Sequence, residues 1–236
     1  MIKRRSFITG IKSTKLSLKE KYFIKKFKPW GIILFSRNIK SIEQTYNLTT
    51  EIKKIFKDKN YPILIDQEGG KVSRLKALIN TEPFTGEYFG KLYSKDLKKF
   101  DKYYKVFVNK TCDLLKQIGV NINTVPVLDL RVKGASKVIG NRSFSNNPKL
   151  VSKLGNICIK NHHKNIIGTV MKHIPGHGMA KVDSHTTTPR VKTNFKNLRK
   201  NDFFTFKNKK SFFAMTAHII YENIDSKNTA THSKKI

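Results

Sequence analysis

The chain has 236 residues, 38% of them hydrophobic, and its 48 basic and 16 acidic side chains give a net charge of +32. This length and apolar content suffice for one sizeable core, so a single domain over residues 1–236 is the simplest organisation. The basic N-terminal segment has too short an apolar run for a signal peptide, and no stretch is long enough to cross a bilayer. The composition therefore excludes a membrane-spanning protein.

The strong positive charge raises the question of a nucleic-acid partner. Only eight of the basic residues are arginines, and the lysines are spread over every predicted helix. Proteins that read nucleic acid usually cluster arginine or interleave aromatic residues on one face, and the sequence has no such cluster. We therefore interpret the charge as a lysine-rich, solvated surface and disfavour nucleic acid as a partner.

The two cysteines, Cys112 and Cys158, fall in amphipathic helical segments, where a small thiol usually fills core space. Nothing in their placement requires a disulfide, which favours a reducing compartment. We therefore expect a cytoplasmic protein.

Short apolar runs alternate with longer helical patterns along the whole chain. The runs are rich in Ile, Val, Leu and Phe without a clean polar alternation, which is typical of parallel strands covered on both sides. They span residues 6–11, 30–37, 62–67, 121–130, 166–173 and 212–221.

Helical patterns lie between these runs. Residues 41–60 begin with Ser41 and Gln44 in capping-box spacing, and residues 95–118 carry an apolar stripe that Gly119 ends. Another helix begins at Asn147 with Pro148 in its first turn. Repeated strand and helix units predict right-handed crossovers and a parallel sheet, hence an α/β fold.

Two α/β architectures fit this order: an open doubly wound sheet and a closed barrel. No G-x-G-x-x-G pattern follows the first strand, which weakens the dinucleotide-binding version of the open sheet. Polar residues instead follow several consecutive strands, as in "SRN", "DQEGG" and "KHIPGHG". A barrel active site draws its residues from the carboxyl ends of several strands, so this distribution of polar residues favours the barrel.

The stretch "KHIPGHGMAKVDSH", residues 172–185, allows three interpretations: a metal site, an acid–base pair or a polar loop. Pro175 and Gly176 separate His173 from His177, so these histidines do not share a helical face, and no nearby residue completes a ligand set. We expect no metal. Asp183 lies two residues before His185, where it can orient the imidazole for proton transfer. On spacing alone, a solvated polar loop remains the alternative.

A second polar stretch, "DQEGGKVSRL", starts with the carboxylates Asp66 and Glu68 and ends with the guanidinium of Arg74. Carboxylates and arginine bind the vicinal hydroxyls of sugars well. A phosphate cradle is disfavoured, because the acidic residues before the glycines would repel phosphate.

Taken together, these segments resemble glycoside hydrolase family 3, in particular its bacterial β-N-acetylhexosaminidase branch. The resemblance implies a (β/α)8 barrel that needs no cofactor and removes terminal N-acetylglucosamine from muropeptides during peptidoglycan recycling in the cytoplasm. It covers nearly the whole chain in the family's order. The matching segments are "WGIILFSRNI", "LIDQEGGKVSRL", "VPVLDL", "GNRSFSNNPKLV", "KHIPGHG" with "DSH", and "MTAHIIYENID".

The resemblance also implies residue roles. His185 is the expected general acid–base and Asp183 its orienting partner, an arrangement that replaces the usual carboxylic acid of glycosidases with an imidazole. His177 is expected to shape the loop. The expected sugar-binding residues are Asp66, Arg74, Arg142, Lys172 and His173.

The family's retaining mechanism also needs a carboxylate nucleophile, which lies in an S-D-D-L-like motif on the seventh strand. Here "NTATHSKKI", residues 228–236, resembles the segment before that motif, and Glu222 and Asp225 match non-catalytic positions. We therefore expect a barrel truncated after about six β/α units, with unpaired edges on its first and sixth strands. The chain is expected to be a gene fragment, one part of a split gene whose remainder is a separate chain, or a decayed copy, and its expected function is hydrolysis only once the missing segment completes it. The alternatives are an inactive or sugar-binding fragment and a nucleic-acid-binding protein.

Overall fold

The computed structural model describes residues 3–135, 138–182 and 187–236. Its main sheet has six parallel strands, each hydrogen-bonded to the next in chain order. These are β1 (Arg5–Gly10), β2 (Pro29–Leu34), β3 (Ile63–Ile65), β4 (Ile122–Asn123), β5 (Gly168–Ile174) and β7 (Phe213–Thr216). Every predicted apolar run contributes a strand.

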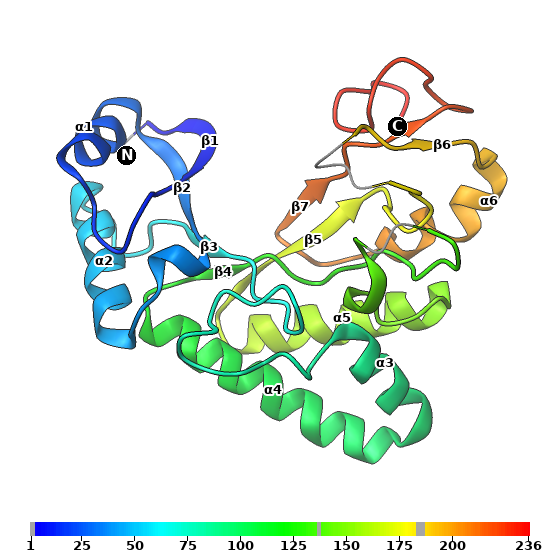
Figure 1. The fold of residues 1–236 in the computed structure, drawn as a ribbon, viewed down its shortest axis with the longest axis horizontal. Coiled ribbons are helices and arrows are strands. Elements are labelled where there is room, and N and C mark those ends of the chain that lie inside the picture. The colour runs from blue at the N-terminus through cyan, green and yellow to red at the C-terminus, as the bar shows by residue number, and fades with distance from the viewer. Residues whose placement is uncertain (1–2, 136–137, 183–186) are drawn as a thin grey trace.

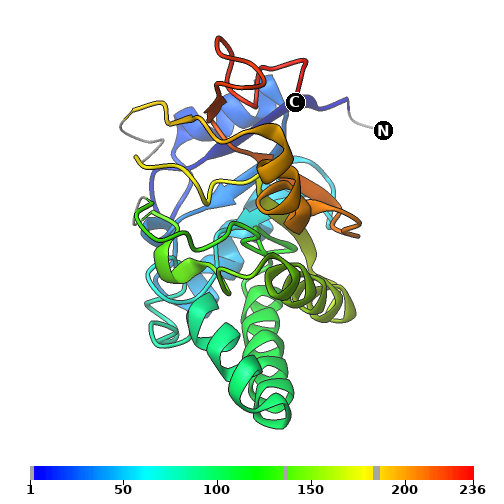
Figure 2. The ribbon, with the colours of Figure 1, turned by 90° about the vertical axis from the view of Figure 1, so that its right-hand side faces the viewer.

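The sheet is curled, with β1 and β2 at one end and β5 and β7 at the other (Figure 1). Helices α4 and α5 lie along its outer side, and the segment after β7 lies on the opposite side of the molecule from α3 and α4 (Figures 1 and 2). This is the curvature of a (β/α) barrel, of which the described residues form six strands.

The helices connect and flank the strands. They are α1 (Leu18–Phe27), α2 (Ile42–Ile55), α3 (Gly86–Lys95), α4 (Leu97–Gln117), α5 (Pro148–Lys164) and α6 (Phe195–Lys200). Three short 3₁₀ turns complete the set: η1 (Ser36–Asn38), η2 (Gly140–Arg142) and η3 (Phe203–Phe206). The three helices expected from the sequence correspond to α2, α4 and α5, whereas α1, α3 and α6 were not expected.

The expected caps are confirmed, with a correction to the box at α2, whereas two helix bounds differ: α2 ends at Ile55 rather than continuing to residue 60, and α4 begins at Leu97 rather than at residue 95. The Ser41 hydroxyl accepts the Gln44 amide hydrogen at 3.2 Å, but the Gln44 side chain accepts from Lys40 rather than Ser41, so the capping box is one-sided. Asn147 caps α5 through two backbone amides, with Pro148 at the first helical position. Gly119, at φ +76°, ends α4.

Two of the strands differ from their predicted extent. The last apolar run splits into β7 and β8 (Ile220–Tyr221), and β8 pairs with β6 (Arg190–Val191) in a separate two-stranded sheet. Residues 217–221 leave the main sheet because Ala217, Ile219 and Tyr221 pack into a second small core. Strand β4 is short because the amide of Val125 donates to the carbonyl of Asn123 at 2.9 Å rather than to a neighbouring strand.

The concave side of the curled sheet is apolar and open. Leu64, Ile122 and Val170 form a small cluster there, against which Trp30 and Met215 pack. A groove of about 570 Å³ runs along this face and reaches Ile8 and Phe213 on the two end strands. Among the described residues β1 pairs only with β2 and β7 only with β5 in this sheet, which agrees with the expected unpaired edges.

Candidate active site

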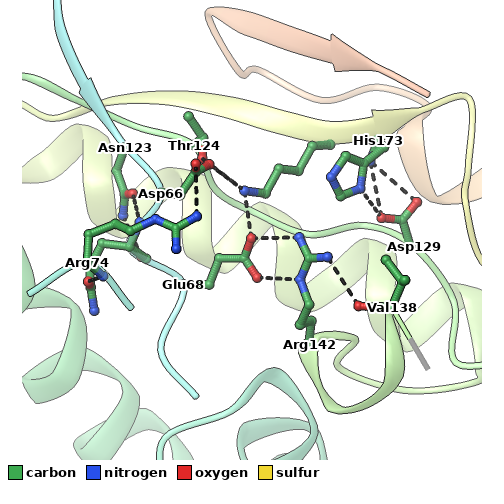
Figure 3. Close-up of polar contacts among 11 residues, drawn as sticks. Asp66, Glu68, Arg74, Asn123, Thr124, Asp129, Val138, Arg142 and His173 are labelled. Atoms are coloured by element: carbon green, nitrogen blue, oxygen red, sulfur yellow. Dashed lines mark hydrogen bonds and ion pairs between the residues drawn. The ribbon is translucent and has the colours of Figure 1, made fainter. Parts of the chain in front are cut away.

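The polar residues expected at the site gather at the carboxyl ends of three neighbouring strands (Figure 3). Asp66 directly follows β3, Thr124 directly follows β4, and Lys172 and His173 lie within β5. Because the strands are parallel and adjacent, their carboxyl ends meet at one rim of the sheet. The fold thus brings together residues more than 100 positions apart: the side chains of Asp66 and Lys172 are 106 residues apart in sequence.

Lys172 is the centre of this rim. Its Nζ lies 3.0 Å from Oδ1 of Asp66, 2.6 Å from Oε1 of Glu68 and 2.9 Å from Oγ1 of Thr124. The hydroxyl of Thr124 in turn donates to Asp66. Only 2% of the Lys172 side chain is exposed. A buried ammonium needs such partners, because an unpaired charge in the interior is strongly unfavourable.

Glu68 joins Lys172 to Arg142. The Nε and Nη2 atoms of Arg142 each donate to one oxygen of Glu68 at 2.8 Å, which forms a two-pronged ion pair (Figure 3). The remaining guanidinium nitrogen donates to the carbonyl of Val138 at 3.2 Å. Arg142 ends the short turn η2, so this ion pair ties the segment before α5 to the turn after β3.

Arg74 approaches Asp66 from the other side, with 3.5 Å between its Nη2 and Oδ2 of Asp66. The turn that carries it is built around the side chain of Gln67, whose Oε1 accepts the backbone amides of Arg74 and Leu75 at 2.9 and 3.1 Å. The guanidinium also lies over the ring of Phe35, 5.7 Å from its centroid. Arg74 and Asp66 are both partly exposed and can therefore meet a ligand.

The network keeps its carboxyl groups ionised. Burial by itself would raise the pKa of Asp66, but the charges of Lys172 and Arg74 and the hydrogen bond from Thr124 lower it to about 2. Burial acts on Glu68 in the same direction, and Lys172 and Arg142 outweigh it, so its pKa is also lowered. At neutral pH the site presents carboxylate acceptors beside fixed cationic donors.

His173 belongs to a neighbouring cluster around the buried carboxylate of Asp129. Its Nδ1 lies 2.7 Å from Oδ2 of Asp129, and the backbone amides of His173 and His177 both donate to the same carboxylate, at 3.2 and 2.6 Å. Burial would raise the pKa of Asp129, but His173 and these hydrogen bonds lower it. The contact with Nδ1 therefore fixes the orientation of the His173 ring.

The structure brings Asp66, Arg74, Arg142 and Lys172 into one network, with His173 next to it. Asp183 and His185 lie outside the described residues. Two residues that hold the site together were given no role from the sequence: Thr124 and Asp129. Glu68 was expected as a carboxylate acceptor for sugar hydroxyls, whereas the structure shows it bridging Lys172 and Arg142. Asp129 had a usable signal, because it is a single charge within the apolar segment "VPVLDL" and is fully buried.

Two further features of the described residues bear on other classes of protein. Within them, no three His, Cys, Asp or Glu side chains come close enough to hold a metal ion. None of the helices over those residues is both long and apolar enough to cross a bilayer.

The chain is similar to known glycosidases in sequence. The family model described as "Glycosyl hydrolase family 3 N terminal domain" matches residues 7–236. A β-hexosaminidase of Hydrogenovibrio crunogenus is 34% identical over 199 residues, which are 83% of this chain and 55% of that protein. A β-hexosaminidase of Neisseria meningitidis is 32% identical over 230 residues, which are 96% of this chain and 63% of that protein. The chain thus spans less than two thirds of these relatives.

Solved structures give the same result. A crystal structure of NagZ from Neisseria gonorrhoeae in complex with N-trifluoroacetyl-D-glucosamine superposes with a TM-score of 0.87 at 30% identity, over 95% of this chain and 67% of that one. A family 3 β-N-acetylglucosaminidase from a Paenibacillus superposes with a TM-score of 0.84 at 27% identity, over 95% of this chain and 43% of that one. Since the family model covers almost all of its residues, this chain belongs to glycosyl hydrolase family 3.

Proposed function

We propose that this chain is the sugar-binding part of a β-N-acetylhexosaminidase that removes terminal N-acetylglucosamine from muropeptides by a retaining mechanism. The observation that carries the proposal is the network of Asp66, Glu68, Arg142 and Lys172, with Arg74 at its exposed side. Its carboxylates and cations are held in place before any ligand arrives, so little ordering is needed on binding.

The chemistry of these groups suits a sugar ring. A carboxylate such as Asp66 accepts hydrogen bonds from two neighbouring hydroxyl groups, while Arg74 and His173 donate to their oxygens. Lys172, whose three hydrogens meet Asp66, Glu68 and Thr124, holds these groups in place for the sugar. The partly exposed ring of Phe35 beside Arg74 adds an apolar surface at the rim. The gonococcal relative was crystallised with an N-acylated glucosamine, which supports N-acetylglucosamine as the ligand.

In the proposed reaction, His185 donates a proton to the glycosidic oxygen as the bond from the anomeric carbon to that oxygen breaks. A carboxylate bonds to the anomeric carbon and forms the glycosyl intermediate. Neutral His185 then takes a proton from water, whose oxygen displaces the carboxylate and returns the enzyme to its first state. Asp183 orients the imidazole throughout. The nucleophilic carboxylate is proposed to come from the S-D-D-L-like segment of the family, which lies outside these 236 residues.

We place this reaction in the cytoplasm, as part of peptidoglycan recycling. The two cysteines support a reducing compartment, because both are buried and unpaired. Burial raises the pKa of each thiol to about 12, so both are unreactive core residues.

A second candidate function is a sugar-binding protein without hydrolytic activity. It is favoured by the same network, which is complete without the nucleophile. A chromogenic N-acetylglucosaminide separates the two candidates: addition of a separately produced C-terminal segment bearing the S-D-D-L motif should start hydrolysis, whereas the purified 236-residue chain should show none. Hydrolysis by the chain alone would overturn the proposed origin of the nucleophile.

Sugar binding itself is tested by titrating N-acetylglucosamine into the purified chain in a calorimeter. Asp66→Ala should weaken binding at least ~10-fold, since it removes an acceptor for charged hydrogen bonds. Asp113→Ala is the matched control, because Asp113 lies on the surface of α4 beside Lys116. Equal affinities of the two variants would contradict the proposed site.

A further inference from the structure

Beyond the sugar site, the chain between His173 and Gly178 passes between two buried carboxylates. Asp129 holds it from one side through the amides of His173 and His177. Asp202 holds it from the other side: its Oδ1 accepts the amide hydrogen of Gly178 at 3.1 Å. Asp202 is only 1% exposed and lies directly before η3. The two carboxylates come from distant parts of the sequence and fix one short backbone segment.

The two glycines of "PGHG", Gly176 and Gly178, leave the space that this contact needs. A Cβ on Gly176 would lie 2.5 Å from Cβ of Asp202, and Gly176 itself has φ +142°. A Cβ on Gly178 would lie 2.7 Å from the carbonyl oxygen of Leu130 and 2.9 Å from Oδ1 of Asp202. Any larger residue would push the segment away from Asp202. The glycines therefore allow the backbone to approach the carboxylate.

Asp202 is itself held in place. The hydroxyl of Thr205 donates to its backbone carbonyl at 2.8 Å, which starts the turn η3. The hydroxyl of Tyr221 donates to the carbonyl of Gly176, so the same segment is fixed at a second point. The contact between Asp202 and Gly178 thus joins two parts of the chain that are each rigidly supported.

A buried carboxylate is an unfavourable choice for a position that only fills space. Among the described residues, Oδ2 of Asp202 has no hydrogen-bond partner. Burial and the nearby charge of Asp129 raise the pKa of Asp202 to about 7. An apolar side chain would avoid this penalty but would leave the Gly178 amide without an acceptor. A carboxylate at position 202 is therefore explained by the acceptor that it provides for the Gly178 amide.

We propose that Asp202 is a positioning residue. It fixes the backbone of residues 176–178 in one conformation and so sets the direction in which the chain continues from the sugar site. In the sequence this segment runs on to Asp183 and His185. A role of this contact in catalysis, through the stretch that carries Asp183 and His185, rests on the proposed function. The fixing of the backbone of residues 176–178 does not. Asp129 supplies the opposing anchor and at the same time orients His173.

Hydrogen exchange of the full chain, followed by mass spectrometry of its peptides, tests the proposal. Asp202→Leu keeps most of the side-chain volume but removes the acceptor, so exchange over residues 176–182 should accelerate about 10-fold or more. Asp202→Asn keeps an oxygen for the Gly178 amide and should stay within about twofold of the unmodified chain. Asp101→Asn, on the outer surface of α4, is the control.

Unchanged exchange in Asp202→Leu would overturn the proposal, as would equal acceleration in Asp202→Asn. Acceleration of peptides from α4 and α5 to the same degree would also overturn it, since that would mean a general loss of stability. Calorimetric titration of N-acetylglucosamine into the unmodified chain distinguishes a failure of the proposed function from a failure of the proposed role of Asp202. Failure of the sugar to bind would count against the proposed function and leave the exchange result valid.

Discussion

Glu68 shows how a single residue can control the site without facing the ligand. Its two oxygens hold both Lys172 and Arg142, and it is almost fully buried. Glu68→Gln removes the negative charge shared by two cations, so the free energy of unfolding should fall by about 3 kcal/mol. Urea denaturation measures this.

The control for that variant is Glu51→Gln. Glu51 pairs with Lys21 at 2.6 Å, but both side chains are well exposed to solvent. Removing a surface ion pair of this kind should change the free energy of unfolding by less than about 1 kcal/mol. Similar losses in the two variants would show that the buried network contributes no more than an ordinary surface pair.

Asp202 makes stability depend on pH. Because its pKa rises from 3.8 to about 7 on folding, the folded chain binds the proton more tightly, and stability falls as pH rises from about 4 to about 7. Asp202→Asn removes this dependence, and the groups that face it, Asp129 and Tyr221, stay unchanged. Relative to the unmodified chain, the variant should gain up to about 4 kcal/mol between pH 4 and pH 8.

Denaturation at these two pH values measures that gain. A difference between variant and unmodified chain that stays the same at both pH values would mean that Asp202 is ionised in the folded and unfolded chain alike.

Sequence reasoning found some residues of the site and missed others for a physical reason. Asp66, Arg74, Arg142 and Lys172 follow from the family motifs, and the structure places them together. The role of Glu68 depends on Arg142, 74 residues away in the sequence. Spacing within a motif carries no information about such a partner, so a buried bridging carboxylate becomes visible only once the fold is known.

At the scale of elements, helices with a strong apolar periodicity were predicted from the sequence, and helices with a weak one were not. Helices α2, α4 and α5 each bury several residues along an apolar stripe, which the sequence displays. Helix α1 buries only Ile24, so its pattern is faint. Its signal lies at the start instead: Ser17 and Glu20 form a complete capping box.

The capping box of α1 should contribute measurably to the free energy of unfolding, although the helix itself packs weakly. Ser17 accepts the Glu20 amide hydrogen at 3.2 Å, and Glu20 accepts the amide hydrogen of Ser17 at 2.9 Å. Ser17→Ala should lower the free energy of unfolding by about 1 kcal/mol, measured by urea denaturation. Ser13→Ala, at an exposed position before the helix, should have almost no effect. The cap account fails if the two substitutions are equivalent.

At the scale of the whole molecule, the dominant feature is the curled sheet with an open apolar concave face. Ile8 and Phe213, at opposite ends of the sheet, are 45% and 39% exposed. Exposed apolar faces beside unpaired strand edges favour association. We expect the chain to self-associate as its concentration rises, and sedimentation velocity would detect this.

Charged substitutions identify the surface responsible. Phe213→Lys should shift the chain toward monomer, because it places a charge in the groove. Leu18→Lys is the control: Leu18 is exposed as well, but it lies on α1 outside the groove. If Leu18→Lys disperses the assemblies as strongly, association depends on general charge rather than on the open face of the sheet.

The central claim is that the ionic network at the carboxyl ends of β3, β4 and β5 binds a sugar. A crystal structure of the chain soaked with N-acetylglucosamine tests it most directly. The account predicts that sugar hydroxyls lie about 3 Å from the carboxylate of Asp66 and the guanidinium of Arg74. A second pocket of the chain is lined by Glu87, Lys91, Lys95, Arg131 and Lys133. A sugar bound there instead, with Asp66 and Arg74 untouched, would contradict the account.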